Sequence, residues 1–138
     1  MLTKQALNVT FKQIATLIDI SMLQRPYEAC SLLLGVVKDC IFLVKEIHHM
    51  QNIDLSQDTF QMSGTDLVNA YEYSSGRDLD VIGIFHSHIN GIRPSKKDIR
   101  FMEINPVVWL IYSVSDFRFG AYIMEDSIKE VSIKVIKD

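Results

Sequence analysis

The sequence contains few residues of the kinds that mark fibrous, disordered or disulfide-rich chains. It has 2 cysteines, 3 prolines and 6 glycines among 138 residues. Two cysteines are too few for a disulfide scaffold and fit a reducing compartment. No repeat, charge block or Pro/Gly/Ser-rich linker divides the chain, which excludes a collagen-like or low-complexity protein. Because domains most often contain about 100–150 residues, a single domain over residues 1–138 is expected.

The sequence also lacks an excess of positive charge and a long apolar run. Lys and Arg number 14 against 17 Asp and Glu, so the net charge is −3 at pH 7. This balance provides no broad basic surface for nucleic acid or for an anionic membrane. No segment approaches the roughly 18 apolar residues of a membrane helix, and no secretory signal is visible at the start. These absences predict a cytoplasmic protein that binds neither nucleic acid nor membrane. Nothing in the sequence indicates its oligomeric state.

What is present is a chain that is 48% hydrophobic, with its apolar residues in helix-like and strand-like segments. Helices are predicted at 11–24 after Thr10 as a cap, at 65–74 after Ser63, and from Ser95 to about 104. Strands are predicted at 29–37, 41–47, 80–85, 107–114, 117–124 and 128–136, with 60–62 as a further short candidate. Interleaved helices and strands indicate an α/β class fold, with a mixed sheet flanked by helices.

The most informative segment runs from His86 to Asp98, with the sequence HSHINGIRPSKKD. Side chains two apart on a strand point to the same face, so His86 and His88 can converge on one metal ion. Asp98 falls in the first turn of the following helix and can bring a carboxylate over the strand end. Two imidazoles and one carboxylate leave one coordination position open for water, which is typical of catalytic zinc rather than of a closed structural site.

Simpler explanations exist for parts of this pattern. Ser95 and Asp98 have the spacing of a helix capping box, which needs no metal. An apolar strand that ends in two imidazoles has little structural reason to do so, and the joint pattern therefore favours a metal site. His48 and His49 are adjacent, so on a strand they face opposite ways and are not expected to chelate as a pair.

A zinc site of this type also needs a base that is not a ligand. Glu28 is the candidate, because it precedes an apolar strand in the segment PYEACSLLLG. The alternative is that Glu28 is a solvated loop residue, and the spacing alone favours that alternative.

The combination Pro-x-Glu-x-x-x-Leu-Leu-Leu-Gly, then His-Ser-His about sixty residues later, then Pro-Ser-x-x-Asp, resembles the JAMM family, also called MPN-plus metalloproteases. The resemblance implies a curved mixed sheet with helices around it, similar to the cytidine deaminase class. It implies Zn²⁺ held by His86, His88 and Asp98, with Glu28 as general acid/base and Ser95 helping to hold the oxyanion. The family includes isopeptidases that cut after the Gly-Gly end of ubiquitin-like modifiers or sulfur-carrier proteins, so such a protein is the expected substrate.

The chain departs from the family pattern at three positions. Ile89 stands where the family usually has Pro, and the six residues 89–94 replace the usual seven before the Ser. Ser31 stands where Gly is common. The shorter loop bears on how Asp98 approaches the metal, and the Asn90-Gly91 pair offers a turn that can absorb the missing residue. Two alternatives to the peptidase therefore stay open, a non-catalytic scaffold of the same fold and a metal-dependent nucleic-acid-processing enzyme.

Overall fold

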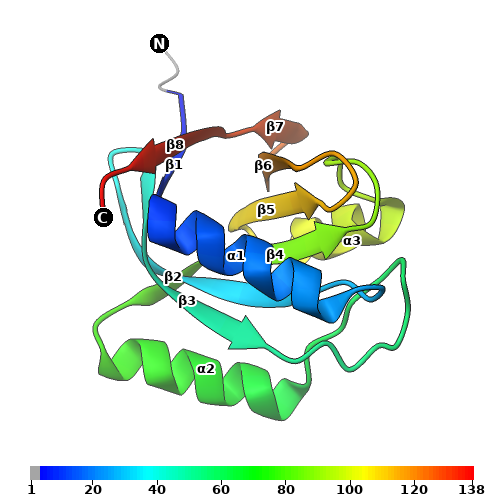
Figure 1. Ribbon diagram of the computed structural model, residues 1–138. Coiled ribbons are helices and arrows are strands. Elements are labelled where there is room, and N and C mark those ends of the chain that lie inside the picture. Colours follow the sequence, from blue (N-terminus) through cyan, green and yellow to red (C-terminus); the bar gives the residue numbers. More distant parts are fainter. Residues whose placement is uncertain (1–3) are drawn as a thin grey trace.

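The computed structural model describes residues 4–138. Eight strands form one mixed sheet, and three helices pack on its two faces (Figure 1). The helices are α1 (Phe11–Gln24), α2 (Gly64–Gly76) and α3 (Lys96–Ile104). The strands are β1 (Ala6–Thr10), β2 (Cys30–Lys38), β3 (Ile41–Met50), β4 (Asp80–His88), β5 (Val108–Ser113), β6 (Arg118–Met124), β7 (Ile128–Glu130) and β8 (Ser132–Ile136). No helix within residues 4–138 has the length and apolar character needed to span a membrane.

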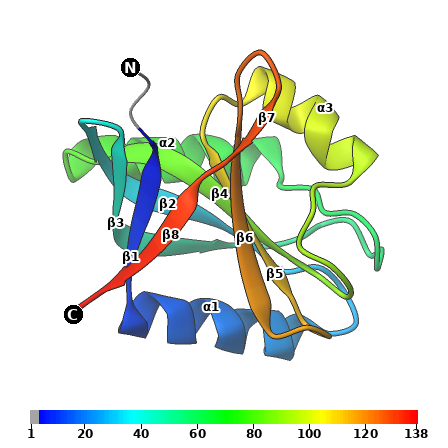
Figure 2. The same cartoon turned by 90° about the horizontal axis from the view of Figure 1, so that it is seen from above.

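The sheet is strongly curved because its two outermost strands are consecutive in the chain. The strand order is β7-β6-β5-β4-β2-β3-β1-β8, so the segment that pairs with β6 continues directly into the segment that pairs with β1. Figure 2 shows this C-terminal segment crossing from beside β6 to beside β1. The predicted class, a curved mixed sheet flanked by helices, is confirmed.

Two hydrophobic cores lie on opposite faces of the sheet. One contains Leu17 of α1, and the other contains Ala70 of α2 and Met102 of α3. Within β5, alternate residues enter the two cores, with Leu110 in the first and Trp109 in the second. A strand covered on both faces is apolar at every position, which explains why β2 and β5 do not alternate between apolar and polar residues.

The cap residues that the sequence predicted begin their helices. Thr10 and Ser95 each form a full capping box, and Ser63 accepts a hydrogen bond from the Asp66 N–H. The Asn90-Gly91 turn is also present, with Gly91 at a φ of 83°, a conformation that glycine adopts without strain.

The structure corrects the predicted strands at three places. The short strand β1 lies before the first predicted helix and was not expected. Residues 60–62 are not a strand, although the Gln61 carbonyl accepts a hydrogen bond from the Ile53 N–H. The predicted strand at 128–136 is two strands, because Val131 lies where the chain changes partner from β6 to β1.

Candidate metal centre

The end of β4 and the start of α3 bring two imidazoles and one carboxylate together. The Nε2 atoms of His86 and His88 lie 2.9 Å apart, and each is 3.1 Å from Oδ2 of Asp98. The side chain of His86 is fully buried, and those of His88 and Asp98 are 11% and 6% exposed. The i, i+2 spacing on β4 and the first turn of α3 therefore produce a compact and almost fully buried triangle of ligand atoms.

Asp98 serves the helix and the triangle with the same oxygen. Its Oδ2 atom accepts a hydrogen bond from the Ser95 N–H at 2.9 Å, while Ser95 Oγ accepts one from the Asp98 N–H at 3.1 Å. The capping box and the candidate metal site, which are alternatives at the level of sequence, thus coexist. Burial alone would raise the pKa of the Asp98 carboxyl, but its hydrogen bonds with His86 and His88 hold that pKa well below its usual range.

The shorter loop after His88 fixes the orientation of the second imidazole. Nδ1 of His88 lies 3.2 Å from the carbonyl oxygen of Gly91, and a carbonyl oxygen only accepts hydrogen bonds. In the neutral ring the hydrogen therefore sits on Nδ1, and Nε2 presents a lone pair to the triangle. The Gly91 N–H in turn donates to Ser113 Oγ and to an Asp116 carboxylate oxygen. The loop of six residues thus brings His88 and Asp98 within reach of each other.

The two histidines differ in their electrostatic surroundings. Full burial lowers the pKa of His86, which therefore favours a neutral ring. Burial alone would also lower the pKa of His88, but the hydrogen bond with Asp98 and the negative charges of Glu28 and Asp98 raise it. The His86 ring is packed between Phe60, stacked at a centroid distance of 4.7 Å, and Trp109, edge-on at 5.8 Å.

The three ligand atoms of this triangle fit a zinc ion. Zinc takes imidazole nitrogen and carboxylate oxygen at about 2.0–2.2 Å in tetrahedral geometry, which separates neighbouring ligand atoms by about 3.3 Å. The observed separations of 2.9–3.1 Å are close to that value. With the hydrogen of each neutral ring on Nδ1, the two Nε2 atoms and the Asp98 oxygen all present lone pairs, and a cation would satisfy the three together.

Glu28 lies beside this triangle, just before β2. The residue is 3% exposed, which excludes the alternative of a solvated loop position. Glu28, His86 and His88 each offer a ligand atom within 4.8 Å of one another, a looser grouping than the Asp98 triangle. Burial raises the pKa of Glu28 to about 8, although the positive character of His88 partly opposes that rise.

A cleft of about 250 Å³ opens beside the triangle. It is lined by Glu28, Gln57, Asp58, His88, Ile89, Asn90 and Ser95. One wall is therefore the loop between β3 and α2, and the other is the loop between β4 and α3. The Ser95 hydroxyl, which accepts from the Asp98 N–H, keeps its own hydrogen free to donate into this cleft.

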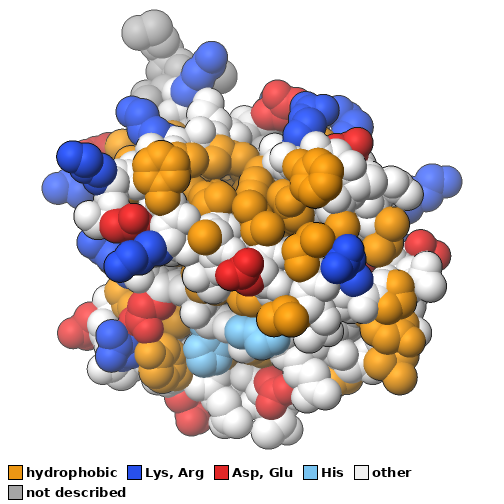
Figure 3. All heavy atoms as spheres, in the orientation of Figure 1, with side chains coloured by type: hydrophobic (Ala, Val, Ile, Leu, Met, Phe, Trp, Pro, Cys, Tyr) orange, Lys and Arg blue, Asp and Glu red, His pale blue; other side chains and the backbone are white. Residues whose placement is uncertain are grey.

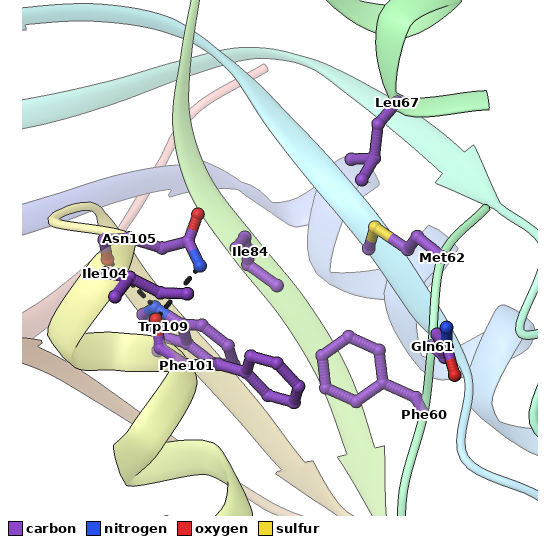
Figure 4. Close-up of a pocket in the computed structure, with 9 residues that line it drawn as sticks. All are labelled: Phe60, Gln61, Met62, Leu67, Ile84, Phe101, Ile104, Asn105 and Trp109. Atoms are coloured by element: carbon purple, nitrogen blue, oxygen red, sulfur yellow. Dashed lines mark hydrogen bonds between the residues drawn. The ribbon is translucent and has the colours of Figure 1, made fainter. Parts of the chain in front are cut away.

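Phe60 also lines a second and more apolar pocket, of about 410 Å³. Side chains from α2, α3, β4, β5 and the β3–α2 loop point into it, and Asn105 forms its polar end (Figure 4). Phe60 and Trp109 line this pocket and also contact the His86 ring. The pocket and the triangle therefore share a wall.

The other residues considered from the sequence lie elsewhere. His48 packs against Tyr73 at a ring distance of 5.2 Å, and His49 is exposed on β3. Figure 3 shows histidine side chains at the surface, below the hydrophobic side chains gathered over the middle of that face. Cys30 is fully buried, and burial raises the pKa of its thiol to about 12, while Cys40 lies in the β2–β3 turn.

Two residues around Glu28 were not anticipated from the sequence, although the motif His-Ser-His contains one of them. Asn52 donates to the Glu28 carbonyl oxygen, and Ser87 accepts from the N–H of Ala29. A serine between two metal-ligand candidates and an asparagine at the start of a polar loop are weak signals without tertiary contacts.

Comparison with known proteins places the chain among characterised sequences and folds. Residues 12–122 match the family model described as prokaryotic homologs of the JAB domain. The chain is 32% identical over 110 residues to a desampylase from Pyrococcus furiosus, which covers 79% of this chain and 75% of that protein.

Two solution structures are similar to the fold described above. A protein from Desulfitobacterium hafniense superposes with a TM-score of 0.86 and 25% identity, over 96% of this chain and 94% of that one. A protein from Salinibacter ruber superposes with a TM-score of 0.71 and 23% identity, over 96% and 92% of the two chains.

Proposed function

The chain belongs to the JAMM, or MPN-plus, family, among the prokaryotic homologs of the JAB domain, and from that premise we propose that it is a zinc-dependent isopeptidase or peptidase. Its proposed substrates are conjugates of ubiquitin-like modifier or sulfur-carrier proteins, cut after a Gly-Gly tail. The desampylase relative supports hydrolysis of modifier conjugates, and the geometry around Glu28 supports hydrolytic chemistry. Residues 1–138 are proposed to act as one catalytic domain in the cytoplasm.

His86, His88 and Asp98 are proposed to hold the zinc ion. When bound, zinc supplies Lewis-acid chemistry, since it acidifies water and polarises a carbonyl group. The remaining work is done by the side chains of this protein. Asp98 fixes the geometry because the N-terminus of α3 holds its carboxylate, and Gly91 fixes the tautomer of His88.

Glu28 is proposed to move the proton, and its placement is the observation that carries the proposal. Its carboxylate is buried beside the histidines, and no described residue forms a hydrogen bond with its Oε1 atom. A buried acceptor without a partner is costly unless the site uses it. An oxygen of Glu28 takes a proton from the attacking water and then returns it to the leaving amine.

Ser95 is proposed to stabilise the negative charge that develops on the scissile carbonyl oxygen. Its hydroxyl faces the cleft from the start of α3, and a preorganised donor of this kind is typically worth about 10²–10³-fold in rate. The cleft is small, at about 250 Å³, and an extended Gly-Gly tail has no side chains that would have to fit into it. We infer that the tail enters between Gln57 and Asn90, which line opposite walls.

A cleavage assay across several conjugates with Gly-Gly tails, run with and without a chelator, tests this function. We expect cleavage that the chelator abolishes and added zinc restores. Cleavage that survives complete removal of metal would contradict the zinc mechanism. If no conjugate is cut and partners bind equally well without zinc, the protein is a non-catalytic scaffold and not an enzyme. Cleavage of nucleic acid in place of the conjugates would favour the metal-dependent nucleic-acid-processing enzyme.

A further inference from the structure

The carboxylate of Glu28 must be placed by its backbone, because its side chain is not anchored. Oε1 is buried and has no hydrogen-bond partner in the part of the chain that the structure describes. Glu28 also lies outside β2, which begins at Cys30, so no ladder hydrogen bond of a strand holds it. A proton-transfer group nevertheless needs a position fixed to within about 0.5 Å. Some other contact must therefore set the position of Glu28.

The peptide group between Glu28 and Ala29 is held at both of its ends by side chains. Nδ2 of Asn52 donates to the Glu28 carbonyl oxygen at 2.8 Å, and the Ala29 N–H donates to Ser87 Oγ, also at 2.8 Å. The Ser87 N–H donates in return to the Ala29 carbonyl oxygen at 3.0 Å. Both Ala29 and Ser87 are almost fully buried, so water does not compete for these bonds. We call the bonds from Asn52 and Ser87 to this peptide group the peptide clamp.

One side of the peptide clamp comes from the strand that carries the histidines. Ser87 lies between His86 and His88, and its side chain points away from the face that they share. A single residue therefore links the backbone of Glu28 to both candidate ligands. Any shift of the Glu28–Ala29 backbone relative to the metal centre would have to break the bond from the Ala29 N–H to Ser87 Oγ.

The other side of the peptide clamp comes from the loop that walls the cleft. Oδ1 of Asn52 accepts from the N–H groups of Asp54 and Gln61, at 2.9 and 3.0 Å. These two bonds join the start and the end of the loop, as an asparagine does in an Asx turn. Gln57 and Asp58, which line the cleft, lie between them. Asn52 thus holds the Glu28 carbonyl with its nitrogen at 2.8 Å, and it holds the cleft wall chiefly with its oxygen, since its nitrogen reaches the Thr59 carbonyl oxygen only at 3.5 Å.

We propose that Ser87 and Asn52 are positioning residues that set Glu28 against the metal centre, and that Asn52 also keeps the cleft wall in place for the substrate tail. This inference rests on the function proposed above. Neither residue touches the reacting atoms, and each acts through the Glu28–Ala29 peptide group. Misplacement of a catalytic group by about 1 Å can cost on the order of 10²-fold in rate.

Serine variants test the side of the peptide clamp on β4. S87A removes the acceptor for the Ala29 N–H, S87T keeps a hydroxyl, and S31A is the matched control. Ser31 is fully buried three residues from Glu28, and its Oγ atom has no hydrogen-bond partner among the described residues. We expect S87A to lower kcat about 10–100-fold with KM and zinc content near wild type. S87T should recover much of the loss, and S31A should match the wild type.

Asparagine variants separate the two roles of Asn52. N52D keeps an oxygen for the Asp54 and Gln61 N–H groups and loses the donor to the Glu28 carbonyl oxygen, together with the long 3.5 Å bond to the Thr59 carbonyl oxygen, whereas N52A loses all of these bonds. We expect N52D to lower kcat with little change in KM. N52A should lower kcat and also raise KM, and it should increase hydrogen exchange in residues 53–61. Equal effects of N52D and N52A on both constants would overturn the two-part assignment.

The amide of Ala29 gives a readout that does not depend on activity. In S87A its hydrogen exchange should accelerate by at least about tenfold relative to the wild type and to S31A, with all three proteins loaded with zinc. Unchanged exchange would overturn the peptide clamp even if no substrate were ever found, so its failure is distinct from failure of the proposed function. If the wild type is active and S87A and N52D both keep its kcat, the positioning role is wrong. If S87A does not fold, N52D decides.

Discussion

Two regions of this molecule each contain a pair of histidines and a glutamate, and they differ in nearly every physical respect. At the end of β4, His86 and His88 point the same way and lie beside Glu28 in a buried setting. On β3, His48 and His49 are neighbours in the chain and Glu46 lies on the exposed surface between β3 and α2.

The two glutamates show what the surroundings do to the same side chain. Glu46 accepts hydrogen bonds from Tyr73 at 2.7 Å and from Arg77, and these lower the pKa of its carboxyl. Glu28 is buried without such donors, and its pKa rises to about 8. A satisfied surface carboxylate stays ionised and holds β3 to α2. A buried and unsatisfied one is held near its titration point, which suits a group that must both take and give a proton.

Replacement of each histidine pair by alanine should give the largest difference between the two regions in zinc content and cleavage activity. In H86A/H88A two of three proposed ligands are lost, so we expect purified protein without zinc and without cleavage activity. In H48A/H49A, zinc content and cleavage should remain near wild type, because His48 packs on Tyr73 and His49 faces solvent. Metal analysis with circular dichroism as a check on folding measures both. Full zinc occupancy in H86A/H88A would remove the basis for the metal assignment.

Replacement of each glutamate by glutamine is the next strongest test. E28Q preserves shape but cannot accept a proton at neutral pH, so cleavage should fall by about 10⁴-fold, the upper end for general acid–base catalysis. Zinc should stay bound, and the uncleaved conjugate should still bind. E46Q loses only surface contacts with Tyr73 and Arg77 and should cleave at close to the wild-type rate. Single-turnover cleavage with parallel zinc analysis distinguishes them, and near wild-type turnover by E28Q would make Glu28 a structural residue only.

The stability of metal-free protein should depend on pH in opposite senses for the two glutamates. The folded pKa of Glu28 lies near 8, above its ordinary value of 4.5. Wild-type stability therefore falls as pH rises from about 4.5 to about 8, since only the unfolded chain ionises freely in that window. E28Q should be more stable than wild type above pH 8, by up to about 5 kcal/mol, and nearly equal to it below pH 4.5.

For Glu46 the sign is reversed. Its folded pKa is lowered, so its contribution to stability is present above the ordinary pKa and is lost as pH falls. E46Q should therefore be slightly less stable than wild type at neutral pH and similar to it in acid. Urea unfolding of chelator-treated proteins at several pH values measures both differences. A constant difference between E28Q and wild type across this range would show that burial does not perturb the Glu28 carboxyl.

The smallest expected effect concerns where the substrate makes its contacts. The loop from residue 51 to 63 is short, and only residues 105–107 separate α3 from β5, so neither connection forms a large platform for a globular modifier. Replacing the body of the modifier while keeping its tail should therefore change kcat/KM by well under a hundredfold. A larger loss, near 3 kcal/mol, would show that a surface outside the cleft, such as the β3–α2 face, binds the body.

Local patterns in the sequence were sufficient to predict most helices and strands. The caps Thr10, Ser63 and Ser95 and the apolar runs of β2, β4 and β5 depend on neighbours within a few residues. β1 was missed because its five residues, ALNVT, become a strand only by parallel pairing with β3 and β8. The break at Val131 has the same origin, since a continuous strand-like segment does not show where a strand changes partner.

The sequence by itself determined the ligand types and the local geometry of the candidate site. The spacing of His86 and His88 on a strand sets their side chains on one face, and the spacing of Ser95 and Asp98 at a helix start sets their capping contact. Both results are independent of the rest of the fold. Only the tertiary structure decided that one Asp98 oxygen serves both the helix and the triangle, and that Glu28 is buried beside it. Glu28 is brought there because β2 pairs with β4, with Cys30 opposite His86. This register lets the Ala29 N–H donate to Ser87 Oγ, although the two residues are 58 positions apart in the sequence. Burial and pairing of this kind depend on the whole sheet, so no local pattern encodes them.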